Sequence, residues 1–296
     1  MDEVIKELQE CFDVVINNYY IHFLKFSIMP EEYIGCYPFE HYESPYLSKK
    51  ELDEYKEETE VPNGIDLNVG QQRCMLDAIR DNYWDLKQES LEKGKRYTTS
   101  NGFYNWEDAL VLSSFILRYK PKQIIEIGSG YSTFRMIDIN ESRFDWNVHI
   151  SCIEPYPQRL YSRLRGDEKN FSVEEKFVQE VPLDFFESLK EGDILFIDSS
   201  HIIKSGGDLP YEYFEILPKL NPGVIIHIHD IFYPFTYPKN WLSIGCCYNE
   251  AYLLRALLTN NSNYEILYFN NYMHNELIET IGEDFISGGS IWIRKK

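Results

Sequence analysis

Short runs rich in Ile, Val and Phe alternate with amphipathic segments along the chain from about residue 98 onward. This alternation is typical of βαβ units, in which parallel strands are joined by helices that cover the sheet. The pattern therefore predicts an α/β protein with a doubly wound, mainly parallel sheet. We expect its seven strands at Gln123–Ile127, Val148–Ile153, Glu175–Gln179, Asp193–Ile197, Val224–His229, Glu265–Phe269 and Ser290–Arg294.

Apolar residues at helical spacing predict the helices that connect these strands. We expect them at Trp106–Arg118, Ser132–Ile139, Tyr211–Leu217 and Glu250–Leu258. The connection between the last two strands is rich in Asn, Gly and Asp and shows no helical pattern. The last strand is therefore expected to enter the sheet antiparallel, as a hairpin partner of its neighbour.

The first 97 residues have a different character. Apolar residues at helical spacing open the chain, an aromatic and proline-bearing region follows near Pro38, and a charged stretch occupies residues 49–60. We expect a mostly helical extension at residues 1–97 and the α/β domain at residues 98–296. The extension could cover the mouth of a binding site or form an oligomer interface, and both options stay open.

Composition excludes some partners. The chain of 296 residues has 29 Lys and Arg against 48 Asp and Glu, a formal net charge of -19, so it repels nucleic acid and anionic membrane surfaces. The amino terminus lacks the basic stretch and apolar run of a signal peptide, and no uninterrupted apolar segment is long enough to span a membrane. The six scattered cysteines are interpreted as reduced thiols, which favours a cytoplasmic location.

Candidate ligand-binding residues follow the first two strands, where open parallel sheets bind ligands. The turn from Gly128 to Gly130 lets backbone amides approach a ligand closely, although a tight strand-to-helix turn also needs glycine. Glu154 follows the second strand and can accept hydrogen bonds from the hydroxyls of a ribose, or it is a solvated loop carboxylate. Thr133 stands where a dinucleotide fingerprint has its third glycine, so a single nucleoside fits better.

Polar clusters follow the fourth and fifth strands. Asp198, His229 and Asp230 are expected to converge within coordination distance of a divalent metal ion, because these two strands are neighbours in such a sheet. A cation there would lower the pKa of a bound hydroxyl, and His201 would act as the general base. His227 is interpreted as a core residue.

Three segments carry a family resemblance, which covers the chain from about Asn101 to its carboxyl terminus. IIEIGSGYST, CIEP and GDILFIDSSH resemble the first, second and fourth motifs of class I S-adenosylmethionine-dependent methyltransferases. The resemblance implies a Rossmann-like methyltransferase fold, with the glycine turn at the methionine portion, Glu154 at the ribose, and Gln179 or Glu180 near the adenine. Ser132 replaces a glycine that is frequent in the family, and a serine there can cap the following helix. The cofactor-binding residues expected on this basis are Glu126, Gly128, Ser129, Gly130, Ser132, Glu154 and Asp198.

The second half of the site is similar to that of metal-dependent sugar O-methyltransferases of antibiotic biosynthesis. Asp198, His201 and Asp230 match that pattern, which implies methyl transfer to a hydroxyl of a sugar or natural product with His201 and Asp198 as catalytic residues. His229 departs from it by replacing a carboxylate, so Mn²⁺ fits as well as Mg²⁺. Two alternatives remain: a hydroxylase-like relative on the same fold and a non-catalytic binding domain. A homo-oligomer is also possible.

Overall fold

The computed structural model describes residues 46–56 and 62–296 of the chain. The chain divides into two compact units, of which the larger comprises residues 57–238 and 248–296. The predicted opening helix and the region near Pro38 lie outside the described residues. Within the described residues, no helix is long and apolar enough to cross a membrane.

The described part of the smaller unit contains two short helices that contact each other, α2 (Lys49–Glu54) and α10 (Lys239–Ser243). α2 begins at a capping box, in which the side chains of Ser48 and Glu51 each accept a hydrogen bond from the backbone amide of the other residue. This reciprocal pair satisfies two amide groups that the first turn of a helix leaves free.

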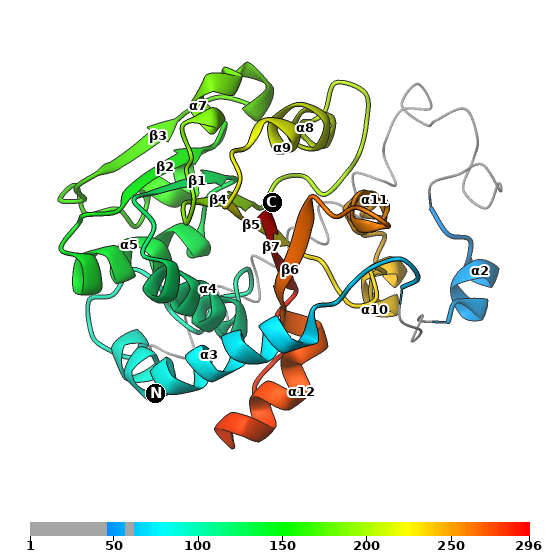
Figure 1. Cartoon of the computed structure of the whole chain (residues 1–296), viewed down its shortest axis with the longest axis horizontal. Helices are drawn as coiled ribbons and strands as arrows, with labels where there is room; N and C mark the ends of the chain where they lie inside the picture. Colours follow the sequence, from blue (N-terminus) through cyan, green and yellow to red (C-terminus); the bar gives the residue numbers. More distant parts are fainter. Residues whose placement is uncertain (1–45, 57–61) are drawn as a thin grey trace. The chain divides into compact units, whose positions relative to one another are not determined.

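A seven-stranded sheet runs through the larger unit in the order β3-β2-β1-β4-β5-β7-β6 (Figure 1). The first five strands are parallel, and β7 lies antiparallel between β5 and β6. The winding reverses between β1 and β4, which is where open parallel sheets bind their ligands. The strands are β1 (Gln123–Ile127), β2 (His149–Ile153), β3 (Phe171–Glu174), β4 (Ile194–Ile197), β5 (Ile225–His229), β6 (Tyr264–Phe269) and β7 (Ser290–Lys295).

Helices cover the sheet in two groups (Figure 1). The first group packs together as α3 against α4, α4 against α5, and α12 against both α3 and α4. The second group includes the segments between β4 and β5, which contact α7. The helices are α3 (Val69–Ser90), α4 (Trp106–Tyr119), α5 (Tyr131–Phe144), α6 (Gln158–Tyr161), η2 (Val178–Glu180), α7 (Leu183–Glu187), α8 (Asp208–Tyr211), η3 (Glu212–Ile216), α9 (Leu217–Lys219), α11 (Glu250–Leu258) and α12 (Asn270–Ile281).

The core is centred on the inner strands. Every residue of β4 and β5 is buried, as the continuous apolar runs of strands covered on both faces require. The Phe196 ring packs 3.9 Å from the His227 ring, and Trp292 packs 4.0 Å from Phe115 of α4 (ring centroids). This aromatic stack joins three adjacent strands to the helix beneath them.

The predicted fold class is confirmed: the sheet has seven strands, is mainly parallel and ends antiparallel. Six strands lie within one residue of their expected bounds. The third was placed wrongly, because β3 ends at Glu174 and the expected segment 175–179 forms a loop and part of η2. β3 is an edge strand whose four residues are only half-buried, so it lacks the apolar run that marks the inner strands.

The expectation of a connection without a helix before the last strand was also wrong. α12 occupies Asn270–Ile281 between β6 and β7 and ends at Gly282, whose left-handed backbone donates a hydrogen bond to the Ile278 carbonyl. Only Asn270, Met273 and Leu277 of α12 are buried. Three buried residues on a mainly polar segment produce a hydrophobic periodicity that is too weak to predict a helix.

α3 belongs to the same compact unit as the sheet, although it lies within the first 97 residues. It packs against α4, α12 and β6. Its fully buried Gln72 accepts a hydrogen bond from the backbone amide of Phe269 at 2.9 Å and donates one to the Leu67 carbonyl. The compact unit that contains the sheet therefore begins before residue 98.

We expect Leu277→Ala to lower the free energy of unfolding by about 2–5 kcal/mol, because it opens a cavity where α12 meets the core. Glu279→Ala, an exposed change on the same helix, should stay within about 0.5 kcal/mol of the native protein. Urea unfolding of both variants tests this. Equal stabilities of the two variants would show that α12 is not packed as described.

Candidate functional site

The turn after β1 brings three strand ends together. Gly128 has a φ of +81°, and its amide donates a hydrogen bond to the Ile153 carbonyl at the end of β2 (3.0 Å). A Cβ at this position would lie 2.0 Å from the carbonyl oxygen of Asp198, which follows β4. Only glycine combines this conformation with this close approach.

Glu126 supports the turn from the protein interior. Its fully buried carboxylate accepts hydrogen bonds from Ser132 Oγ (2.5 Å), Thr133 Oγ1 (2.6 Å) and Cys152 Sγ (3.2 Å). Burial raises the pKa of Glu126 to about 7, against the opposing effect of these donors. The Ser132 hydroxyl therefore donates to Glu126, whereas the sequence suggested a helix cap.

Glu154 is held by backbone amides. Its Oε2 accepts a hydrogen bond from the Ser129 amide (3.1 Å), and its Oε1 accepts one from the Tyr156 amide (2.8 Å). The side chain is half-buried at the end of β2. These two hydrogen bonds hold the carboxylate next to the glycine turn. Its remaining lone pairs can accept hydrogen bonds from a ligand.

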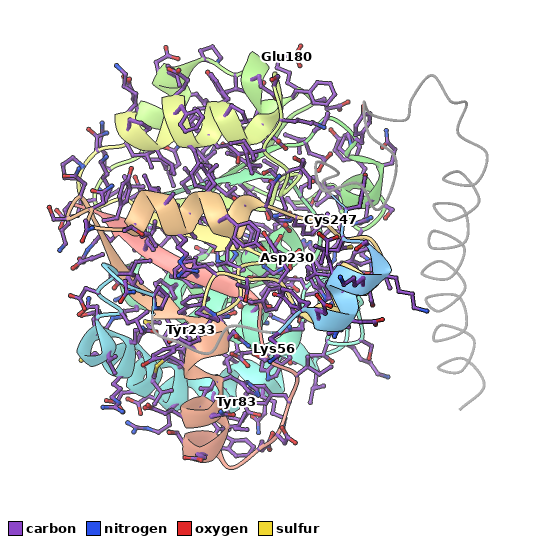
Figure 2. The ribbon with its side chains drawn as sticks, turned by 90° about the vertical axis from the view of Figure 1, so that its right-hand side faces the viewer. Lys56, Tyr83, Glu180, Asp230, Tyr233 and Cys247 are labelled. Carbon is purple, nitrogen blue, oxygen red and sulfur yellow. The ribbon has the colours of Figure 1, made fainter. Side chains whose placement is uncertain are left out.

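A cavity of about 520 Å³ lies at these strand ends, within the size range of small-molecule sites. It brings together three of the predicted cofactor residues, Gly128, Glu154 and Asp198. Gln179 also lines it, whereas the Glu180 carboxylate accepts a hydrogen bond from the Phe177 amide and lies at the periphery of the view in Figure 2. The lining residues are Ile127, Gly128, Ile153, Glu154, Pro155, Phe177, Val178, Gln179, Asp198, Ser199, Ser200, Lys204, Gly206, Gly207 and Asp208.

His201 lies among three carboxylates. Its Nε2 is 3.3 Å from Asp198 Oδ1 and 3.5 Å from Asp230 Oδ2, and its Nδ1 is 2.8 Å from Glu250 Oε2. The ring is buried, and its backbone has a φ of +58°. His229 joins the cluster through Nε2, which lies 3.6 Å from Asp230 Oδ1. The structure thus brings together the four residues predicted for the catalytic and metal sites.

Charges within this cluster shift one another's pKa. Burial opposes ionisation of Asp198, but His229 and His201 outweigh it and lower the pKa of Asp198 to about 2. Burial also disfavours the charged form of His201, yet Asp198, Glu250 and Asp230 raise the pKa of that ring well above its usual value. Burial raises the pKa of Asp230, whose nearby histidines only partly compensate. Asp198 is therefore ionised at neutral pH.

His227 occupies a different environment. Its ring packs against Phe196 and Trp292, and neither ring nitrogen has a hydrogen-bond partner among the described residues. Burial lowers the pKa of His227 well below its usual value, so the ring is neutral. It belongs to the core.

Asp198, Asp230 and His229, the predicted metal ligands, offer two carboxylates and an imidazole. Donors of these types suit a divalent metal ion. Across residues 46–56 and 62–296, however, no group of three or more His, Cys, Asp or Glu side chains is arranged to hold a metal ion. A metal role for these residues stays a prediction.

Comparisons with known proteins bear on this strand-end site. Residues 125–231, from β1 to just past β5, match the family model described as a methyltransferase domain. The chain is also 35% identical over 169 residues to a protein of Archaeoglobus fulgidus described as uncharacterized, an alignment that covers 53% of this chain and 76% of that protein. The chain therefore contains a methyltransferase domain.

Solved methyltransferase structures are similar at low identity. A methyltransferase of Podospora anserina bound to S-adenosylhomocysteine is 15% identical, with 74% of this chain and 88% of that chain covered and a TM-score of 0.43. The O-methyltransferase TomG of Streptomyces achromogenes, in complex with S-adenosylmethionine, is 13% identical over 76% and 89%, with a TM-score of 0.41. Because these TM-scores lie below 0.5, the assignment rests on the matched domain at residues 125–231.

Two acidic residues of the methyltransferase site were not among the sequence predictions. Glu250, at the start of α11, contacts His201 from 49 positions away in the chain. Asp208 accepts hydrogen bonds from Ser200 N (2.9 Å) and Ser200 Oγ (2.6 Å) and so shapes the cavity wall. The motif pattern around Asp198 shows neither contact, since each joins the loop after β4 to the first residue of a later helix, α8 or α11.

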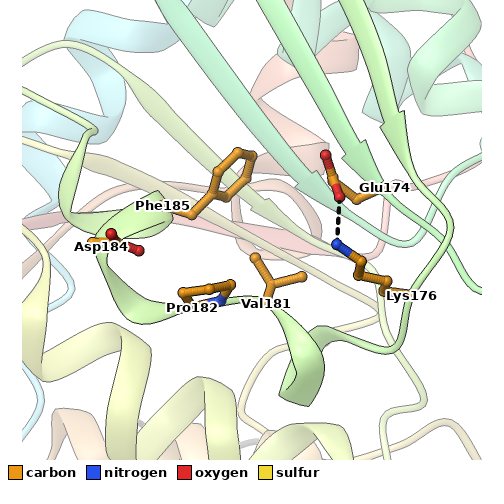
Figure 3. Close-up of a pocket in the computed structure, with 6 residues that line it drawn as sticks. All are labelled: Glu174, Lys176, Val181, Pro182, Asp184 and Phe185. Carbon is orange, nitrogen blue, oxygen red and sulfur yellow. Dashed lines mark hydrogen bonds and ion pairs between the residues drawn. The ribbon is translucent and has the colours of Figure 1, made fainter.

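A second pocket of the methyltransferase, about 330 Å³, lies between β3 and α7 (Figure 3). Its charged residues include Glu174 and Lys176, which form an ion pair at 3.0 Å. It shares no lining residue with the larger cavity, and none of the predicted site residues line it. The other lining residues are Val181, Pro182, Asp184 and Phe185.

We expect Gly128→Ala to destabilise the methyltransferase by about 3 kcal/mol or more, because its Cβ collides with the Asp198 carbonyl in addition to the strain of a positive φ. Gly166→Ala provides the matched control, since Gly166 has a φ of +80° and open space around it. That change should cost about 1 kcal/mol. Chemical unfolding of both variants decides, and equal losses would contradict the close approach.

Proposed function

We propose that this methyltransferase transfers the methyl group of S-adenosylmethionine to a hydroxyl oxygen of a small molecule, with a sugar or glycan-like compound as the acceptor. The observation that carries the proposal is the position of His201. Its Nε2 faces Asp198, and Asp198 lines the cavity at the glycine turn. A proton acceptor thus lies beside the space where a cofactor and an acceptor would meet.

The cavity residues suit the cofactor. When bound, S-adenosylmethionine would supply a methyl group on a positively charged sulfur. Attack of an acceptor oxygen on the methyl carbon would form a C–O bond and break the C–S bond, with S-adenosylhomocysteine as the leaving group. Glu154 offers carboxylate lone pairs for ribose hydroxyls, and the turn at Gly128 presents backbone without an intervening side chain. The ionised Asp198 favours a cationic ligand nearby.

His201 serves as the general base in this proposal. When Nε2 takes the proton of the acceptor hydroxyl, the resulting imidazolium is stabilised by Asp198, Asp230 and Glu250. The same charges raise the pKa of the ring. A protonated ring cannot accept a proton, so the competent fraction of molecules grows as the pH rises.

The acceptor class rests on the resemblance of Asp198, His201 and Asp230 to the pattern of sugar O-methyltransferases. A hydroxyl needs a base before it can attack, and His201 meets that need. We propose that residues 98–296 are the catalytic domain, against which α3 packs, and that residues 1–97 include a cover for the acceptor site or an oligomer interface. A hydroxylase-like use of the same site is the second candidate, and detection of methylated product separates the two.

The role of Asp198, His229 and Asp230 as ligands of a metal ion is a separate proposal and has its own test. If they bind a required ion, dialysis against EDTA should lower turnover at least about tenfold, and Mg²⁺ or Mn²⁺ should restore it. Metal analysis of the dialysed protein verifies removal. Unchanged turnover after complete removal would eliminate the metal role.

Two substitutions should separate cofactor binding from chemistry. Glu154→Ala removes the carboxylate at the ribose position and should weaken S-adenosylmethionine binding about 10- to 100-fold. His201→Asn, in which asparagine tolerates the positive φ, should lower kcat about 100-fold or more with little change in cofactor affinity. Calorimetry and transfer of labelled methyl groups to a panel of sugars, glycosides and catechols measure the two effects.

Glu174→Ala is the control for the first change, because it removes a carboxylate from β3 outside the cavity. Its cofactor affinity should equal that of the native enzyme. Unchanged cofactor binding by the Glu154→Ala variant would refute the ribose assignment, and full turnover by the His201→Asn variant would refute the base assignment.

A further inference from the structure

Glu250 is a fully buried carboxylate at the first residue of α11. Both of its oxygens are engaged: Oε2 lies 2.8 Å from His201 Nδ1, and Oε1 accepts a hydrogen bond from the Tyr213 hydroxyl at 3.0 Å. Tyr213 is itself buried, in the segment η3 between β4 and β5. Glu250 is therefore fixed on one side by a phenol and binds the imidazole on the other.

The backbones of the two residues are also joined. The His201 carbonyl accepts hydrogen bonds from the amides of Asn249 (3.1 Å) and Glu250 (3.3 Å), and Asn249 Oδ1 accepts one from the Ile203 amide (2.7 Å). The loop after β4 and the first turn of α11 consequently hold each other. The left-handed backbone of His201 is stabilised by these contacts.

This arrangement determines which ring nitrogen faces the cavity side. The 2.8 Å contact of Glu250 with Nδ1 is shorter than either contact of a carboxylate with Nε2, so in the neutral ring it favours the tautomer that carries the proton on Nδ1 and the lone pair on Nε2. Nε2 is also the nitrogen near Asp198 and Asp230. In general, a base is most effective when a third group orients it.

We propose that Glu250, held by Tyr213, is a positioning residue that fixes the orientation and tautomer of His201. The proposal rests on the proposed function for its effect on methyl transfer. The contact between the two side chains can be tested without turnover.

Glu250→Gln keeps the size of the side chain but replaces a pure acceptor with an amide that can also donate. In protein labelled with ¹⁵N-histidine, the His201 ring signals, assigned with the His201→Asn variant, should shift. The kcat for methyl transfer should fall at least about tenfold, while the dissociation constant of S-adenosylmethionine stays within about twofold. Tyr213→Phe removes only the hydroxyl and should lower kcat about fivefold, so it carries the test if the first variant does not fold.

Glu107→Gln is a matched control. Glu107 is also fully buried and pairs with a histidine through Nδ1, since its Oε2 lies 2.6 Å from His274. This change should shift the His274 signals and leave kcat within about twofold. Equal losses of kcat in the Glu250 and Glu107 variants, or unchanged His201 ring signals in the Glu250→Gln protein, would overturn the proposal.

The two failures are distinguishable. If the native protein methylates no acceptor in the panel, the proposed function fails, whereas the His201 ring signals still show whether Glu250 fixes the imidazole. If the native protein is active and the Glu250→Gln and Tyr213→Phe variants are equally active, only the positioning role fails.

Discussion

The hydrogen-bond ladder between parallel strands continues one residue past the strand ends, and the site depends on that continuation. The Gly128 amide binds the Ile153 carbonyl at 3.0 Å, and the Asp198 amide binds the Ile127 carbonyl at 2.9 Å. Gly128 and Asp198, which line the cavity, are thus positioned by the sheet itself, which is more rigid than a free loop. A glycine is needed where the first of these turns passes the Asp198 carbonyl, since any Cβ would collide.

Charge compensation links the stability of this region to its chemistry. Asp198, Asp230 and Glu250 surround His201. Burial alone would lower the pKa of His229, but the carboxylates of Asp198, Asp230 and the buried Asp108 outweigh burial and raise it. Buried charges are costly unless they are paired, so each group depends on the others. Removal of one therefore affects both the fold and the proton affinity of its neighbours.

The elements that the sequence predicted well are those with many buried residues. β4 and β5, covered on both faces, appear in the sequence as continuous apolar runs and were placed within one residue. β3 is a half-buried edge strand, and α12 buries only three residues, so neither has a strong periodic signal. At the site, the sequence placed the glycine turn, Glu154, Asp198 and His201 at one edge of the sheet because each lies in a loop that follows a strand.

The sequence by itself determined which chemical groups follow each strand and therefore which groups meet at one edge of the sheet, because parallel strands bring their carboxyl ends together. Only the tertiary structure decided how these groups pair. Glu126 turns inward to Ser132 and Thr133, and Glu250 reaches His201 across 49 residues. Such contacts depend on how helices pack against the sheet and which side chains lose their water, and these are properties of the folded core that no local pattern records.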